Sequence, residues 1–183
     1  MNKFNYRRLV PIVILAVVLV VTLRSTIFAS YVVDGESMEP TLYDGNLLMV
    51  NKIVYDLKDI DRFDVIVFHA NEEEDYVKRV IGLPGDEIEY INDQLYVNSE
   101  QVEEKFLDSY VQASDSKPFT KNFVLKDVTG KQKVPEDNLF VMGDNRQDSL
   151  DSRSIGFIST EQLVGKVDVT YWPLSQTKLG FGK

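Results

Sequence analysis

The sequence predicts a mainly β protein, in which a single N-terminal transmembrane helix precedes a curled antiparallel β-sheet or partly closed barrel. Two observations lead to this prediction. One long apolar stretch lies within the first 30 residues, and beyond it many short strand-like runs alternate with turn residues. The 183 residues are enough for one domain and one membrane segment.

The apolar stretch extends from Leu9 to Leu23 and is interrupted only by Thr22. Continued as a helix through Arg24 to Phe28, it would be about 30 Å long, which matches the hydrocarbon core of a bilayer. Three basic residues come before it: Lys3, Arg7 and Arg8. They place the N-terminus in the cytoplasm by the positive-inside rule. A cleavable signal peptide is the alternative, but Ile27-Phe28-Ala29 is a poor small-x-small cleavage site.

The strand-like runs beyond residue 30 are short and apolar. They cover residues 47–50, 53–55, 65–68, 76–81, 88–91, 95–97, 139–142 and 167–172. Asn92-Asp93 supplies turn residues between two of these runs, which predicts a hairpin over 88–97. A short helix is expected after Ser159, with Gln162 as its capping-box partner and Gly165 at its end. Residues 99–136 are weakly patterned and predict a hairpin with long, variable loops.

Composition excludes several classes of protein. The chain has no cysteine and one histidine, His69, so disulfides, thiolate sites and His-rich metal sites are not available. Four of the 20 basic residues lie in the first 30 positions, which leaves 16 basic against 29 acidic residues beyond them. Such an acidic domain argues against nucleic-acid binding, because phosphate contacts need lysine and arginine. We expect neither a metal nor a cofactor.

Two residues stand out as candidates for catalysis. Ser37 lies in an irregular loop between Gly35 and Pro40, where an isolated serine is more often a simple turn residue. Lys78 lies in the strand-like run 76–81, and apolar residues on both faces of this strand make burial plausible. A snorkelling or salt-bridged lysine is the ordinary interpretation. A desolvated lysine whose pKa falls two to three units below ~10.4 would instead be usable as a base, at a cost of about 3–4 kcal/mol.

A third segment, residues 143–156, mixes acids, arginines and hydroxyls after an apolar strand. A solvated, salt-bridged loop is the simplest interpretation. A calcium loop fails on spacing, since no glycine stands at the sixth position and Ile155 replaces the bidentate glutamate. The functional interpretation is a scaffold whose hydroxyls and ion pairs orient a catalytic amine.

Taken together, the three segments resemble the successive motif boxes of bacterial type I signal peptidases, in the same order and behind the same kind of anchor. The matching segments are Ser37-Met38-Glu39-Pro40-Thr41-Leu42, residues 76–86, and Gly143-Asp144-Asn145-Arg146 to Asp151-Ser152-Arg153. The resemblance covers nearly the whole chain. Its short length and reduced middle region look like the Gram-positive branch of the family.

The resemblance implies a role for each matching residue. Ser37 would be the nucleophile and neutral Lys78 the general base, with Ser149 steadying the amine. Asp144, Arg146, Asp151, Arg153 and Arg79 would form supporting ion pairs. Some family members place a serine two residues before the nucleophile as an oxyanion donor, and this chain has Gly35 there. The oxyanion hole would then depend on the backbone N–H of Ser37 together with the backbone of Gly35, or another backbone group or water nearby.

The implied function is removal of N-terminal signal peptides from exported preproteins by a Ser-Lys endopeptidase that cuts after Ala-x-Ala-like sites. Residues 1–30 would form the cytoplasmic N-terminus and transmembrane anchor, and residues 31–183 an extracytoplasmic catalytic β-domain. The expected location is the cell membrane, with a single pass. The expected partners are preproteins and the lipid bilayer, with no nucleic acid, and we expect a monomer.

Four other interpretations compete with this one. A Ser-His-Asp hydrolase would use His69, although a strand-end histidine is usually just exposed. The self-cleaving repressors of the SOS response share the dyad chemistry but carry DNA-binding domains in place of an anchor. A Ser-Lys protease of the same fold could have a narrower substrate. A non-catalytic, membrane-tethered β-domain could simply bind exported proteins.

Overall fold

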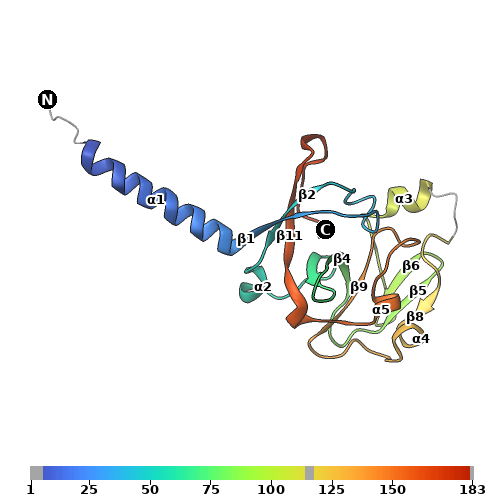
Figure 1. Ribbon diagram of the computed structural model, residues 1–183. Helices are drawn as coiled ribbons and strands as arrows, with labels where there is room; N and C mark the ends of the chain where they lie inside the picture. The colour runs from blue at the N-terminus through green and yellow to red at the C-terminus, as the bar shows by residue number, and fades with distance from the viewer. Residues whose placement is uncertain (1–5, 114–117, 182–183) are drawn as a thin grey trace.

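A long N-terminal helix leads directly into a β-rich body (Figure 1). The structure is a computed structural model and describes residues 6–113 and 118–181. Helix α1 (Tyr6–Ile27) continues into strand β1 (Phe28–Val32) without an intervening loop. Lys3 lies outside the described residues, as do the side chains of Arg7, Arg8 and Arg24. Within the described part of the chain, no helix combines the length and the apolar character that a membrane span requires.

The larger sheet has eight antiparallel strands in the order β1-β2-β11-β3-β4-β9-β10, with β12 paired to β11. Its remaining strands are β2 (Leu47–Asn51), β3 (Val65–His69), β4 (Asp75–Gly82), β9 (Asn138–Met142), β10 (Ile158–Ser159), β11 (Leu163–Trp172) and β12 (Lys178–Leu179). The partly closed barrel that the sequence allowed is wrong. The sheet stays open because its edge strands, β1 and the two-residue β10, lie at opposite ends and do not pair.

The smaller sheet has four strands in the order β7-β6-β5-β8. Strands β5 (Ile88–Ile91) and β6 (Gln94–Val97) form the predicted hairpin, and Asn92 and Asp93 adopt the positive φ values of 51° and 66° that a tight turn needs. In their described part (99–113 and 118–136), residues 99–136 do not form a hairpin of their own. Strands β7 (Glu100–Val102) and β8 (Phe123–Val124) instead pair with opposite edges of that hairpin. The rest includes helices α3 (Asp108–Ala113) and α4 (Leu125–Thr129).

Two further local predictions needed correction. Residues 53–55 do not continue a strand, because β2 ends at Asn51 and helix α2 (Val54–Leu57) follows. The capping box of Ser159 and Gln162 is present, but it starts only the one-turn 3₁₀ helix η1 (Thr160–Gln162). Leu163 returns to extended backbone, so Gly165 lies inside β11 and does not end a helix. Helix α5 (Ser152–Ile155) and the 3₁₀ helix η2 (Leu174–Gln176) complete the fold.

The hydrophobic core determines where the loop after β1 lies. Met38 and Leu42 from this loop are buried in the same cluster as Leu48 and Val50 of β2 and Val65 of β3. Burying each of these side chains contributes about 1.5–3 kcal/mol. The loop that carries Ser37 is therefore fastened to the sheet by its own apolar residues, beside the middle strands.

Candidate active site

Ser37 lies in a compact turn between β1 and β2. The backbone N–H of Glu39 donates to Glu36 O at 3.0 Å, and that of Leu42 donates to Met38 O at 3.0 Å. The buried side chain of Met38, the next residue, holds the turn against the core. The turn therefore leaves Ser37 half-buried at a fixed position on the sheet.

Lys78 lies on β4, near the middle of the larger sheet. Its Cα partner on β3 is Ile66, and its neighbour Arg79 pairs with Met142 at the end of β9. Lys78 is only 4 % exposed. Its Nζ lies 2.7 Å from Ser37 Oγ and donates to Val77 O at 3.1 Å. The structure thus joins the two candidate residues, which are 41 positions apart, by a hydrogen bond.

The surroundings of Lys78 favour its neutral form. Burial lowers the pKa of its amine from 10.5 to about 8, although the carboxylates of Asp151 and Asp144 partly oppose this shift. Between pH 8 and 10.5 the unfolded chain therefore holds more protons on Lys78 than the folded chain does. The contribution of Lys78 to the free energy of unfolding consequently rises with pH across that window.

The segment after β9 closes around the pair. Gly143 leaves no room for a side chain, since a Cβ there would lie 2.2 Å from Ser149 Oγ and 2.4 Å from Ser37 O. The backbone N–H of Asn145 donates to Ser37 O at 3.1 Å. The three sequence motifs, far apart along the chain, therefore meet within one small site.

Two ion pairs, one fully buried and one partly exposed, support this segment. The guanidinium of Arg79 donates to both carboxylate oxygens of Asp144, at 2.8 Å and 2.6 Å, and both side chains are fully buried. Asp144 also accepts a hydrogen bond from the hydroxyl of Thr41, in the Ser37 loop. Arg153 donates to Asp151 at 2.8 Å and 2.7 Å. Burial alone would raise the pKa of Asp151, but Arg153 and the N–H of Gly143 hold it below its usual range.

Arg146 has a partner that the sequence did not indicate. Its fully buried guanidinium donates to Glu104 at 2.5 Å and to Tyr90 Oη at 2.8 Å, and its Nε donates to Gly143 O. Glu104 lies 42 positions away in the weakly patterned region, where exposed acids are common. Nothing in the sequence distinguishes it as the partner of a buried arginine. The pair ties the smaller sheet to the loop that carries Gly143.

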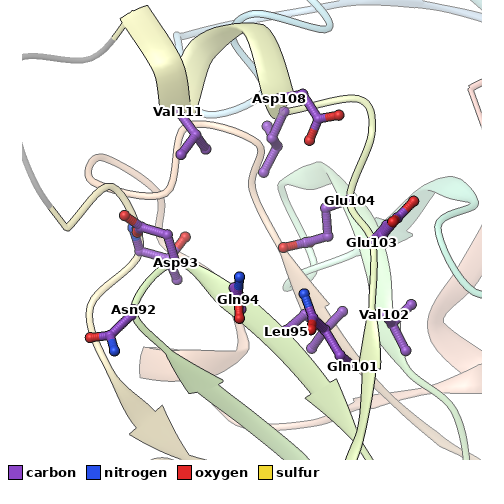
Figure 2. Close-up of a pocket in the computed structure, with 12 residues that line it drawn as sticks. Asn92, Asp93, Gln94, Leu95, Gln101, Val102, Glu103, Glu104, Asp108 and Val111 are labelled. Carbon is purple, nitrogen blue, oxygen red and sulfur yellow. The ribbon is translucent and has the colours of Figure 1, made fainter.

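Glu104 also borders a hollow of about 350 Å³ between β6, β7 and α3, shown in Figure 2. Its lining includes the carboxylates of Asp93, Glu103 and Asp108. Within the described residues, no three histidine or acidic side chains come together as metal ligands would. The visible role of Glu104 in this hollow is its ion pair with Arg146.

Replacing Glu104 with alanine should destabilise the protein by about 3–5 kcal/mol, because it leaves the cation of Arg146 buried without its partner. Urea denaturation of wild type and variant measures this difference. The matched control is Glu103→Ala, since the Glu103 side chain is 74 % exposed. That variant should change the free energy of unfolding by less than about 0.5 kcal/mol. Equal effects of the two substitutions would contradict a stabilising role for the Glu104–Arg146 pair.

Ser149 does not make the contact with Lys78 that the resemblance implied. Its Oγ is buried and has no hydrogen-bond partner within the described residues. It lies close enough to Asp151 to help lower the pKa of that carboxyl, without the geometry of a well-formed hydrogen bond. Lys78 is instead held by Ser37 and the Val77 carbonyl. A steadying role for Ser149 would require its hydroxyl to reorient.

Gly35 also needs correction as a backbone oxyanion donor. Its N–H already donates to Asp44 Oδ1 at 2.9 Å, so it is not free to bind a developing oxyanion. The N–H of Ser37 has no acceptor within the described residues. Of the two predicted donors, only Ser37 therefore remains available.

A pocket of about 210 Å³ opens beside the pair. Its lining residues are Tyr31, Val32, Val33, Asp34, Ser37, Met38, Asp75, Tyr76, Val77, Lys78 and Leu150. Ser37 and Lys78 form part of its wall, so a molecule in this pocket would contact both.

His69 is placed unfavourably for a Ser-His-Asp triad with Ser37. Its Nδ1 lies 2.5 Å from Asp75 Oδ1, and its side chain is 61 % exposed. No hydrogen bond in the described part of the chain joins it to Ser37, whose hydroxyl is bonded to Lys78. The geometry can therefore support acyl transfer in which a buried amine acts as the base.

Comparison with known proteins finds a matching family and several similar relatives. Residues 6–172 match the family described as signal peptidase, peptidase S26. Signal peptidase I of Bacillus caldolyticus is 56% identical over 166 residues, which cover 91% of both chains. Signal peptidase IB of Staphylococcus aureus (strain MRSA252) is 43% identical over 159 residues, covering 85% of this chain and 83% of the relative.

A solved structure extends the similarity to the fold. The crystal structure of a signal peptidase I from Enterococcus faecalis V583 superposes with a TM-score of 0.56 and 38% sequence identity. The match covers 60% of this chain and 97% of that one. The chain therefore belongs to the peptidase S26 family of signal peptidases.

Proposed function

We propose that Ser37 and Lys78 are the nucleophile and general base with which this chain removes signal peptides from exported preproteins. As a member of peptidase S26, the chain is a serine peptidase of the signal peptidase I type. The observation that carries the residue assignment is the 2.7 Å contact between Ser37 Oγ and the buried Lys78 Nζ. Among the described residues, this is the hydrogen bond that joins a lysine amine to a serine hydroxyl.

The positions of these two groups support the following reaction. Neutral Lys78 accepts the hydroxyl proton as Ser37 Oγ attacks the scissile carbonyl carbon, and negative charge develops on the carbonyl oxygen. Protonated Lys78 then gives its proton to the leaving amine as the C–N bond breaks. The acyl group remains on Ser37, and a water molecule that loses its proton to Lys78 hydrolyses the ester. Lys78 then gives that proton to Ser37 Oγ as the ester C–O bond breaks, which restores the serine hydroxyl and the neutral amine.

The pocket beside the pair supports a preference for small residues. We propose that a preprotein binds as an extended strand along this pocket, with Ala-like side chains at the first and third positions before the cut. The buried faces of Met38 and Val33 limit the space for longer chains. A difference of one methylene between two substrate side chains in a hydrophobic pocket changes selectivity by roughly 10–200-fold.

We further propose that residues 1–30 anchor the enzyme in the cell membrane in a single pass, with the N-terminus in the cytoplasm. Residues 31–183 would then form an extracytoplasmic catalytic domain that acts as a monomer. The basic residues before the apolar run support this orientation. An anchor would hold enzyme and preprotein at one membrane face and raise their effective concentration.

Cleavage of a fluorogenic peptide with an Ala-x-Ala site tests the proposed function. We expect cleavage after the second alanine, verified by the mass of the products, and at least ten-fold lower kcat/KM when leucine replaces that alanine. Equal cleavage of the two peptides would contradict the small-residue pocket. Binding without cleavage of any Ala-x-Ala peptide would favour the non-catalytic domain, and cleavage confined to one preprotein would favour the narrower protease.

A further inference from the structure

We propose that the side chain of Asn145 is a positioning residue for the oxyanion hole, because it orients the peptide group whose N–H would bind the developing oxyanion. This inference rests on the proposed function of Ser37. Its starting point is the Gly35 N–H, which is already bonded to Asp44 and leaves Ser37 N–H as the available predicted donor. A residue that fixes the direction of the Ser37 N–H therefore contributes to catalysis.

Asn145 contacts the Ser37 turn in two independent ways. Its backbone N–H donates to Ser37 O at 3.1 Å, and its side-chain Nδ2 donates to Glu36 O at 3.3 Å. Its Oδ1 accepts the backbone N–H of Asp148 at 3.3 Å. The two side-chain contacts together assign the amide nitrogen and oxygen of Asn145. If the two atoms were exchanged, the oxygen would face Glu36 O and the NH₂ group would face the N–H of Asp148.

The Glu36 carbonyl and the Ser37 N–H belong to the same peptide group. That peptide is not one of the two cis bonds found among the described residues, so its carbonyl and its N–H point in opposite directions. When Asn145 Nδ2 and the N–H of Glu39 hold Glu36 O from one side, Ser37 N–H must point away from them. Hydrogen bonds accepted by the carbonyl also polarise the group and strengthen its N–H as a donor.

The side-chain contact can be separated from the backbone contact. Asn145→Asp keeps the size of the side chain and an oxygen for the Asp148 N–H, and the backbone bond to Ser37 O needs no side chain at all. The substitution therefore removes one donor and places a carboxylate oxygen near Glu36 O, which repels it. The turn remains attached to the loop after β9, but the orientation of its peptide is no longer enforced.

The expected result for Asn145→Asp is a kcat lowered by about 10- to 100-fold with KM changed less than about two-fold, since only the transition state uses the oxyanion donor. The matched control is Gln147→Glu, which makes the same change of charge at an exposed position two residues along the loop. It should leave both constants close to those of wild type. The constants are compared on the pH-independent plateau, so that a shifted pKa of Lys78 does not contribute.

Two substrate-like inhibitors isolate the effect. A peptide aldehyde bonds its carbonyl carbon to Ser37 Oγ, with the hydroxyl proton passing to Lys78 and negative charge developing on the former carbonyl oxygen. A reduced-amide peptide has a CH₂ group in place of that carbonyl and therefore has no oxygen to stabilise. Asn145→Asp should weaken binding of the aldehyde by the same factor by which kcat falls. It should leave the inhibition constant of the reduced amide unchanged, and this unchanged constant also shows that the variant is folded.

Equal weakening of both inhibitors, or a kcat within two-fold of wild type, would overturn the role of Asn145. The proposed function is tested separately, because Ser37→Ala should abolish cleavage whatever Asn145 does. Activity retained in Ser37→Ala would refute the nucleophile assignment itself. An inactive Ser37→Ala beside a fully active Asn145→Asp would refute only the inference about Asn145.

Discussion

Replacing Lys78 with alanine should lower kcat by about 10⁴-fold or more, because it removes the only base within reach of the Ser37 hydroxyl in the described structure. Ser37→Ala should be equally damaging. The double variant should be no worse than either single variant, since the two residues act as one unit. Single-turnover cleavage of the Ala-x-Ala peptide measures all three variants.

The control for Lys78→Ala is His69→Ala. His69 is exposed and bonded to Asp75, so its loss should leave cleavage intact. Lys78→Met keeps much of the lysine's bulk without its charge, and should be inactive but at least as stable as wild type near neutral pH, where the buried ammonium is unfavourable. An active Lys78→Met with an inactive His69→Ala would reverse the assignment and restore the Ser-His-Asp interpretation.

Gly143→Ala should lower kcat by about 100-fold or more. The added Cβ would lie 2.2 Å from Ser149 Oγ and 2.4 Å from the backbone oxygen of Ser37, so the backbone must move. A displacement of about 1 Å in a reacting group can cost about 100-fold in rate. Because the contact is with the Ser37 turn itself, the damage should fall on catalysis as well as on stability.

Gly130→Ala separates these two effects. Gly130 has a φ of +76° and open space around it, so alanine there strains the backbone without a clash. It ends helix α4, and the substitution should cost about 1 kcal/mol of stability without changing kcat. Steady-state kinetics and urea denaturation of both variants provide the comparison. A Gly143→Ala enzyme with wild-type kcat would contradict the close packing of Gly143 against the dyad.

Much of the fold could be predicted because the signals were local. The runs at 65–68, 76–81 and 139–142 all form strands of the larger sheet, since short apolar segments with turn residues at their ends have few other stable states. The hairpin over 88–97 followed from Asn92-Asp93. The strand predicted at residues 53–55 was wrong, because a short apolar run is equally compatible with one turn of helix.

The sequence predicted which residues belong to the candidate site but not which partners they contact. Alternation along β4 indicated burial near Lys78, and Lys78 and Arg79 are both buried. The partner of Arg146 could not be found, because nothing in the sequence distinguishes Glu104 from its neighbours until the smaller sheet brings it to the loop after β9. The bond from Gly35 to Asp44 is likewise set by the shape of the turn.

The pH dependence of kcat/KM tests the central claim, a neutral Lys78 acting as the base, most directly. Wild-type enzyme with an Ala-x-Ala peptide that carries no titrating groups isolates the ionisation of the free enzyme. Since the base must be neutral, the rate should rise with pH through an apparent pKa of about 8 and then level off. A rate that does not change with pH from about 6 to 9.5, or that rises only near the ~10.4 of an ordinary lysine, would contradict it.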